Sequence, residues 1–183
     1  MIINILHLIG SILFIIGSVY ALPEQNLKLC LTKDCQYDSS LWFFIGCLCF
    51  LYGNTIKLFS DYSFVETEQK RILIANVFGS LTFLAGSVVY IINFRQQGTF
   101  VFFMGSCIFI VTTSYDYLKF RNKKTLVFLT GSMMFIIGDI VSNKTMSAIL
   151  WLTGSILFTI GTFLGLSLFP KEHKLVPRDI ELV

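Results

Sequence analysis

Six uninterrupted apolar segments of about 18 to 24 residues follow one another along this chain, and only short polar connections separate them. A helix of about 20 apolar residues is long enough to cross the hydrocarbon core of a bilayer. Since 55% of the 183 residues are apolar and only 14% are charged, the composition also lies outside the range of soluble globular domains. We therefore predict an all-α polytopic membrane protein with six transmembrane helices, arranged as three tandem helical hairpins. The predicted spans are Ile2–Leu22, Leu41–Phe59, Ile72–Phe94, Thr99–Leu118, Thr125–Ser142 and Met146–Phe169.

The predicted hairpins divide the chain into four parts. The first hairpin covers residues 1–60, the second 61–122 and the third 123–170, and residues 171–183 form a short cytoplasmic tail. The first segment could instead be a cleaved signal peptide, but residues 1–6 carry no Lys or Arg, and the segment shares its motif with the other five. The sequence leaves open whether the three hairpins form a ring or a row.

The distribution of Lys and Arg predicts the orientation of the helices, because cytoplasmic connections carry an excess of these residues. Ten lie on the side shared by the C-terminus and the connections between hairpins: Lys57, Lys70, Arg71, Lys119, Arg121, Lys123, Lys124, Lys171, Lys174 and Arg178. Four lie on the opposite side: Lys28, Lys33, Arg95 and Lys144. We therefore expect both termini in the cytoplasm and the lipid bilayer as a partner. Since the basic residues are not gathered on one face, we do not expect a nucleic-acid partner.

A motif of five positions recurs once in each of the six predicted helices. It begins with a glycine: Gly10, Gly46, Gly79, Gly105, Gly131 and Gly154. Ser or Cys follows this glycine, and four residues after it every copy has a phenylalanine: Phe14, Phe50, Phe83, Phe109, Phe135 and Phe158. Seven residues after it stand Gly17, Gly53, Gly86, Thr112, Gly138 and Gly161. Eight residues after it stands a compact polar residue: Ser18, Asn54, Ser87, Thr113, Asp139 and Thr162.

These five positions fall within a stripe about 120° wide on a helix, while mostly bulky apolar residues cover the rest. Small residues let helix backbones approach closely within a bilayer, so we interpret the stripe as the helix–helix contact surface and the bulky arc as lipid-facing. Neighbouring helices in a hairpin run antiparallel, and the glycine–phenylalanine–glycine spacing is nearly the same when reversed. A phenylalanine of one helix should therefore fill the notch opposite a glycine of its partner.

The helix pairs of the first two hairpins share a further pattern. Their first helices carry Phe-x-x-Gly-Ser as FIIGS (14–18) and FLAGS (83–87), and their second helices carry FFIGCLCF (43–50) and FFMGSCIF (102–109). This arrangement resembles the YrhK-like family of small membrane domains over Ile2–Phe59 and over Ile72–Phe120. The third hairpin resembles a diverged copy, and the stretch 23–38 is longer than the turn of the family. The resemblance implies membrane hairpins, and it implies no reaction, ligand or catalytic residue.

Asp139 is the side chain best suited to chemistry, because a carboxylate inside a membrane helix is costly and often marks a proton or cation path. It could instead reach the nearby interface and pair with Lys144. The other residues of a polar pathway would be Asn54, Ser18, Ser87 and Thr162. For Asn54, a structural hydrogen bond between helices is the alternative.

Cys30 and Cys35 lie in the longest connection and could form a disulfide if that connection faces an oxidising compartment. The sequence contains no constellation typical of a catalytic or metal site, so we expect no enzymatic activity, no cofactor and no bound metal. Our leading prediction is a structural or interaction module that packs with a second copy, with lipid or with a membrane-protein partner. The alternative is a small-solute or ion transporter or channel with Asp139 on its pathway, since transporters also contain tandem repeats.

Overall fold

A computed structural model describes residues 2–23, 30–32 and 34–167, and these form six α-helices. The helices are α1 (Ile2–Ala21), α2 (Cys35–Asp61), α3 (Thr67–Ile91), α4 (Arg95–Phe120), α5 (Lys123–Ile140) and α6 (Lys144–Ser167). The all-α prediction and the pairing of helices along the chain are confirmed. The predicted tail, residues 171–183, and the end of the sixth predicted span lie outside the described residues.

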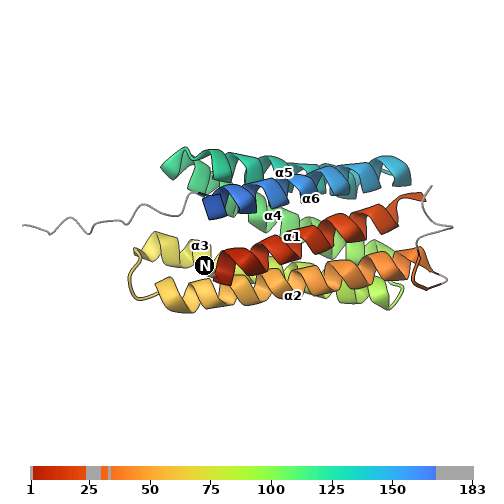
Figure 1. Cartoon of the computed structure of the whole chain (residues 1–183), viewed down its shortest axis with the longest axis horizontal. Coiled ribbons are helices and arrows are strands. Elements are labelled where there is room, and N and C mark those ends of the chain that lie inside the picture. The colour runs from red at the N-terminus through yellow and green to blue at the C-terminus, as the bar shows by residue number, and fades with distance from the viewer. Residues whose placement is uncertain (1, 24–29, 33, 168–183) are drawn as a thin grey trace, which may run out of the picture.

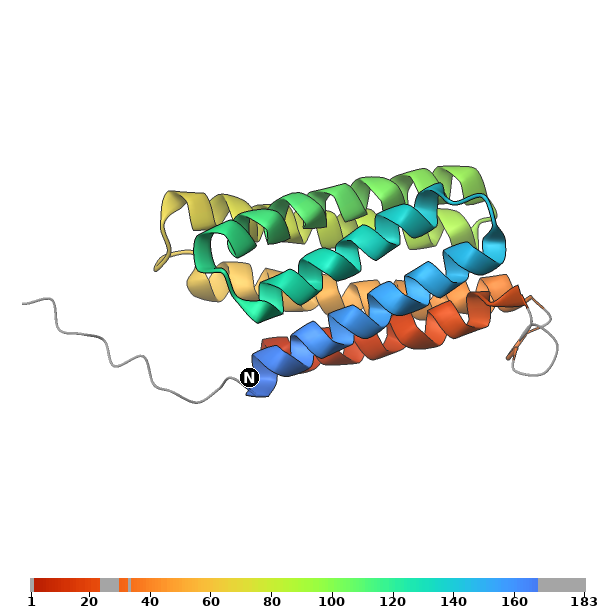
Figure 2. The same cartoon turned by 90° about the horizontal axis from the view of Figure 1, so that it is seen from above.

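The six helices form a closed ring (Figures 1 and 2). Each helix packs against its neighbours along the chain, and α6 packs against α1. Successive helices are antiparallel, so the turns within the three hairpins lie together at one end of the bundle, which we call the hairpin end. The connections α2–α3 and α4–α5 lie at the other end, the linker end, with the start of α1 and the end of α6. The hairpins therefore form a ring and not a row.

Side-chain caps and one left-handed residue set several helix ends. The Asp34 carboxylate accepts the backbone N–H of Gln36 at 3.0 Å where α2 begins. The Asn122 side chain accepts the N–H of Lys124 at 2.9 Å where α5 begins. Such caps satisfy N–H groups that have no partner within the helix. Arg121, at φ 45°, ends α4 in a left-handed conformation, which allows the short turn into α5.

Five of the six helices are long and apolar enough to cross a membrane, by length and composition. The exception is α5, which has 18 residues and includes Lys123, Lys124 and Asp139 among them. The prediction of six comparable apolar spans is thus confirmed for five helices. The shortness and the three charges of α5 separate it from the others.

The motif positions form the inner face of the ring. The first glycine, the Ser or Cys after it and the residue seven positions on are buried in all six helices. The motif phenylalanine is buried in five helices, with Phe109 half-buried, and the last position is half-buried at Thr113 and Asp139. Bulky residues between the motif positions face outward, as Ile12 does at 44% exposure. The helical spacing of the sequence therefore places the small residues where helices meet.

Candidate functional site

Each hairpin contains a reciprocal fit between a glycine of one helix and a phenylalanine of the other. A β-carbon placed on Gly10 would lie 2.8 Å from the ring of Phe50, and one placed on Gly46 would lie 2.6 Å from the ring of Phe14. The corresponding pairs in the other hairpins are Gly79 with Phe109, Gly105 with Phe83, Gly131 with Phe158 and Gly154 with Phe135. This is the arrangement expected when two antiparallel helices carry a glycine–phenylalanine–glycine spacing that is nearly the same in both chain directions.

The second glycines of α1, α3 and α5 receive another set of aromatic rings, nearer the hairpin end. Gly17 faces Phe43, Gly86 faces Phe102 and Gly138 faces Trp151, all at the position three residues before the first glycine of the partner helix. Nearer the linker end, His7 lies against Gly53 and stacks on Phe50 at a centroid distance of 5.1 Å, and Phe128 lies against Gly161. Aromatic side chains thus bridge the two helices of each hairpin at several levels.

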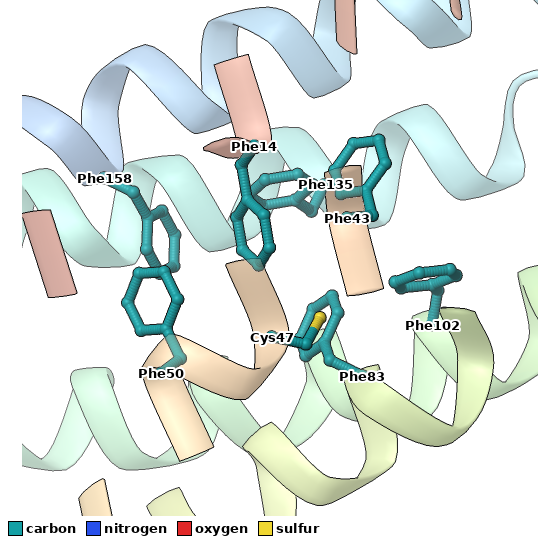
Figure 3. Close-up of a cluster of buried hydrophobic side chains, with 8 residues drawn as sticks. All are labelled: Phe14, Phe43, Cys47, Phe50, Phe83, Phe102, Phe135 and Phe158. Carbon is teal, nitrogen blue, oxygen red and sulfur yellow. The ribbon is translucent and has the colours of Figure 1, made fainter. Parts of the chain in front are cut away.

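A layer of phenylalanines closes the middle of the bundle (Figure 3). The rings of Phe14 and Phe83 each lie edge-on to Phe135, at centroid distances of 6.4 and 6.2 Å, and Phe50 lies edge-on to Phe158 at 6.1 Å. Edge-to-face pairs at such distances are favourable arrangements of aromatic rings. The cavity remaining among them is about 10 Å³, barely enough for one water molecule. We call the rings of Phe14, Phe50, Phe83, Phe135 and Phe158 the aromatic layer, and they pack together across the middle of the bundle.

Polar motif residues pair between hairpins at the ring interfaces. The Ser18 hydroxyl contacts that of Ser155 at 3.2 Å between α1 and α6, and the Ser87 hydroxyl contacts the Cys47 thiol at 3.6 Å between α3 and α2. In both pairs, a residue at the last motif position of one helix contacts a residue at the second motif position of a helix in the adjacent hairpin of the ring. These side chains therefore hold helices together and do not line an open path.

Asn54 makes the most direct of these interhelical hydrogen bonds. Its side-chain amide donates to the hydroxyl of Ser80 at 2.7 Å, and Ser80 donates to the carbonyl oxygen of Asn76 at 2.9 Å. Asn54 therefore joins α2 to α3. This is the structural hydrogen bond between helices that the sequence suggested as the alternative to a polar pathway.

A cavity of about 290 Å³ lies inside the ring at the hairpin end. We call it the vestibule. Its floor consists of rings of the aromatic layer, among them Phe14, Phe83 and Phe135, and its walls include Ser39, Thr99 and other residues of the second helices. Because the aromatic layer closes it from below, the vestibule is a blind cavity that ends near the middle of the bundle.

Asp139 lies in the vestibule wall, in the last turn of α5. Its Oδ1 accepts a hydrogen bond from Trp151 Nε1 at 3.1 Å, while its Oδ2 is buried and has no partner. The suggested pairing with Lys144 is wrong: within the described residues, Lys144 makes no ion pair with Asp139. The indole of Trp151, which fits against Gly138, offers a nearer donor and turns the carboxylate inward.

The α4–α5 interface differs from the other two because of Asp139. Asp139 holds the last motif position of α5, as Ser18 and Ser87 do in α1 and α3. Its partner at the second motif position of the adjacent hairpin would therefore be Ser106. Ser106 Oγ is buried without a hydrogen-bond partner, as is Asp139 Oδ2. The structure therefore lacks the third polar pair and directs the carboxylate to Trp151 in its own hairpin.

Two cations stand at the mouth of the vestibule. Arg95 and Lys144, the first residues of α4 and α6, are exposed and line the cavity together with Asp139. The hydroxyls of Ser39 and Ser147 donate to the carbonyl oxygens of Gly17 and Gly138, each at 2.7 Å, so they are already used between helices. The vestibule thus combines an inner carboxylate, outer cations and an aromatic floor.

Sequence reasoning found only part of this site. Among the residues expected on a polar pathway, Asp139 lines the vestibule, whereas Ser18, Ser87 and Asn54 are buried between helices, and Thr162 is buried with its hydroxyl bonded to Phe158 O at 2.9 Å. The missed lining residues include Trp151, Tyr90, Arg95 and Thr99. The signal for Trp151 was present, since it occupies the aromatic position before a first glycine that Phe43 and Phe102 occupy in the other hairpins.

A disulfide bond joins Cys30, which precedes α2, to Cys35, the first residue of α2, and their Cα atoms are 5.1 Å apart. The buried carboxylate of Asp38 accepts the backbone N–H of Thr32 at 2.8 Å. Together these bonds hold the start of α2, which contributes Gln36 to the vestibule lining. No group of three His, Cys, Asp or Glu residues that could hold a metal ion occurs within residues 2–23, 30–32 and 34–167.

Residues 1–62 match the family model described as YrhK-like protein. The first hairpin is therefore similar to this family, which confirms the resemblance predicted over Ile2–Phe59, whereas the resemblance over Ile72–Phe120 stays a prediction. No curated protein and no solved structure matches the chain.

Proposed function

We propose, on the basis of a first hairpin that is YrhK-like, that this chain is a non-enzymatic integral membrane protein with a solute-binding vestibule. It would cross the bilayer six times, with both termini and the linker end in the cytoplasm. The vestibule would open to the opposite compartment. The observation that carries the binding role is the blind cavity of about 290 Å³ with a half-paired carboxylate in its wall.

The charges support this orientation in the membrane. Among the residues that the structure describes, seven Lys and Arg lie toward the linker end and two, Arg95 and Lys144, lie at the hairpin end, and cytoplasmic connections carry such an excess. The charges of α5 are compatible with a sixth span. Lys123 and Lys124 lie in its first turn, where long side chains can reach the interface, and Asp139 faces the vestibule and not lipid.

The shape of the interior favours binding over conduction. The aromatic layer closes the bundle below the vestibule, and a solute could cross only if several rings moved together. The cavity volume is close to the lower end of the range for small-molecule sites, about 300–1,000 Å³. The packing role expected from the motif is then the means by which the ring is closed, with bilayer lipid, a second copy or another membrane protein contacting its outer face.

Cysteine accessibility tests the proposal. In a background with Cys47, Cys49 and Cys107 replaced by Ser or Ala, single cysteines are placed at Ser147 in the vestibule and at Thr162 below the aromatic layer, both on α6. A membrane-impermeant thiol reagent added at the hairpin side should label the first position and not the second.

Each other outcome of this experiment has a defined meaning. Failure to label Ser147→Cys from either side of the membrane, in a protein of unchanged helicity, would exclude a water-filled vestibule and so refute the proposed function. Labelling of both positions from that side at similar rates would show an open path and favour the transporter or channel alternative. Labelling of Ser147→Cys only from the cytoplasm would reverse the proposed orientation.

A further inference from the structure

The vestibule has opposite charges at two depths. Asp139 lies in the last turn of α5 and is half-buried, whereas Lys144 and Arg95 begin α6 and α4 and are exposed at the mouth. Among the described residues that line the cavity, these three are the charged ones. A ligand with only a positive charge would meet two like charges at the mouth, and a ligand with only a negative charge would leave the carboxylate uncompensated.

The wall around Asp139 is suited to an ammonium group. Trp151 donates to one carboxylate oxygen and leaves Oδ2 without a partner, so an N–H donor would complete its hydrogen bonding. The indole also lies 6.0 Å from the Phe43 ring and 6.5 Å from the Phe102 ring, measured between centroids. Aromatic faces attract cations, most strongly where water is excluded.

The floor and the volume limit the rest of the ligand. The rings of Phe14, Phe83 and Phe135 form an apolar surface at the bottom of the cavity. About 290 Å³ accommodates a small molecule with a short hydrocarbon group and little more. The cavity is therefore amphipathic along its depth, with charge near the mouth and hydrocarbon at its base.

We infer that the ligand of the vestibule is a small zwitterion with an apolar side group, a class that includes apolar α-amino acids. Its ammonium group lies against Asp139, its carboxylate faces Arg95 and Lys144, and its apolar group rests on the aromatic layer. This inference rests on the proposed function, because it requires a vestibule that solutes can enter.

Trp151 provides a direct readout, since the chain has only two tryptophans. Trp42→Phe leaves Trp151 as the single tryptophan and removes an indole nitrogen that is buried without a partner. The full-length Trp42→Phe chain, purified in detergent, is titrated with L-leucine, with 3-methylbutylamine, which lacks the carboxylate, and with 4-methylpentanoate, which lacks the ammonium group. Leucine should change the Trp151 emission saturably, and each compound with one charge should bind about tenfold more weakly or worse, because a charged group is left unpaired.

Two variants assign the charges. Asp139→Asn should weaken leucine binding about tenfold and leave the binding of 4-methylpentanoate unchanged or stronger, since the unfavourable carboxylate is gone. Lys144→Gln should weaken leucine binding and strengthen that of 3-methylbutylamine. Helicity measured by circular dichroism controls for folding, and the three-ligand comparison on the unaltered vestibule stands even if a variant fails to fold.

Acrylamide, a neutral quencher, separates failure of this inference from failure of the proposed function. If acrylamide quenches Trp151 but leucine does not change its emission, the vestibule is open and the zwitterion assignment is wrong. Equal binding of leucine and 3-methylbutylamine would also overturn the assignment and identify a cation site. If acrylamide does not reach Trp151 and Ser147→Cys is not labelled, both the inference and the proposed function fail.

Discussion

Alanine at Gly10 should destabilise the bundle by about 2 kcal/mol more than alanine at Gly79, although both glycines hold the same motif position. The added β-carbon at Gly10 would lie 2.8 Å from the Phe50 ring and 2.9 Å from the carbonyl oxygen of Gly46. Carbon atoms in good contact are about 3.5–4.0 Å apart. The ring can turn, but the carbonyl oxygen moves only with the α2 backbone, so α1 and α2 must separate.

The difference in the free energy of unfolding follows from comparing the surroundings of Gly10 and Gly79. A gap of about 0.5–1 Å forfeits a quarter to a half of the dispersion energy between facing atoms, and overpacking typically costs about 1–3 kcal/mol. At Gly79 the nearest atoms are side-chain carbons of Ile108 and Phe109, both at 3.2 Å, which can yield by a few tenths of an ångström. Alanine favours a helix over glycine by about 1 kcal/mol at both sites. Strain of about 3 kcal/mol at Gly10 and about 1 kcal/mol at Gly79 then leaves net losses of about 2 kcal/mol and about zero.

Unfolding of the detergent-purified protein in mixed micelles with increasing dodecyl sulfate, followed by circular dichroism, measures both free energies of unfolding. Equal losses for Gly10→Ala and Gly79→Ala would refute the argument that backbone contact distinguishes the two hairpins. A double variant adds a second check. Phe50→Leu removes the ring contact but leaves the Gly46 oxygen in place, so it should restore only a small part of the stability lost in Gly10→Ala.

Three further predictions concern single contacts. Phe83→Ala should lower the free energy of unfolding by about 3 kcal/mol, because Phe83 is buried in the aromatic layer, and Leu81→Ala, 47% exposed, should lower it by less than about 1 kcal/mol in the same assay. Asn54→Ala should cost about 0.6 kcal/mol, the average for hydrogen bonds between membrane helices, and at most about 1.7 kcal/mol; a neutral result would mean that the bond contributes nothing. Reduction of the bond between Cys30 and Cys35 should lower the stability by about 2 kcal/mol, as expected for so short a loop, and dithiothreitol should lower the melting temperature of the wild type but not of a double serine variant.

The inner face of the ring could be predicted from the sequence because helical geometry fixes it. Positions separated by three, four, seven and eight residues lie on one side of a helix, whatever surrounds the helix. Gly10, Ser11 and Gly17 are therefore buried together, and Ile12 is exposed. The same reasoning applies to all six helices, since each repeats the spacing.

The vestibule could not be predicted in this way, because it depends on how the helices close. The ring requires contact between α6 and α1, which no local spacing specifies. The partner of Asp139 is Trp151, 12 residues away on the next helix, and this pairing depends on the register of α5 against α6. Lys144 is nearer in sequence, but it begins a new helix after the turn and is exposed. Proximity along the chain therefore suggested the wrong partner.

One departure from the motif indicates that glycine and aromatic positions are matched in pairs. Thr112 stands where five helices have glycine, and it is buried at 1% exposure. In the first and third hairpins the corresponding notch receives His7 and Phe128, each three residues before a first glycine. The residue at that position in the second hairpin is Asn76, whose side chain is smaller than those of His7 and Phe128. A threonine at Gly53 or Gly161 alone would collide with the aromatic ring of His7 or Phe128. The glycine and the aromatic residue that faces it must therefore change together for the six helices to stay packed.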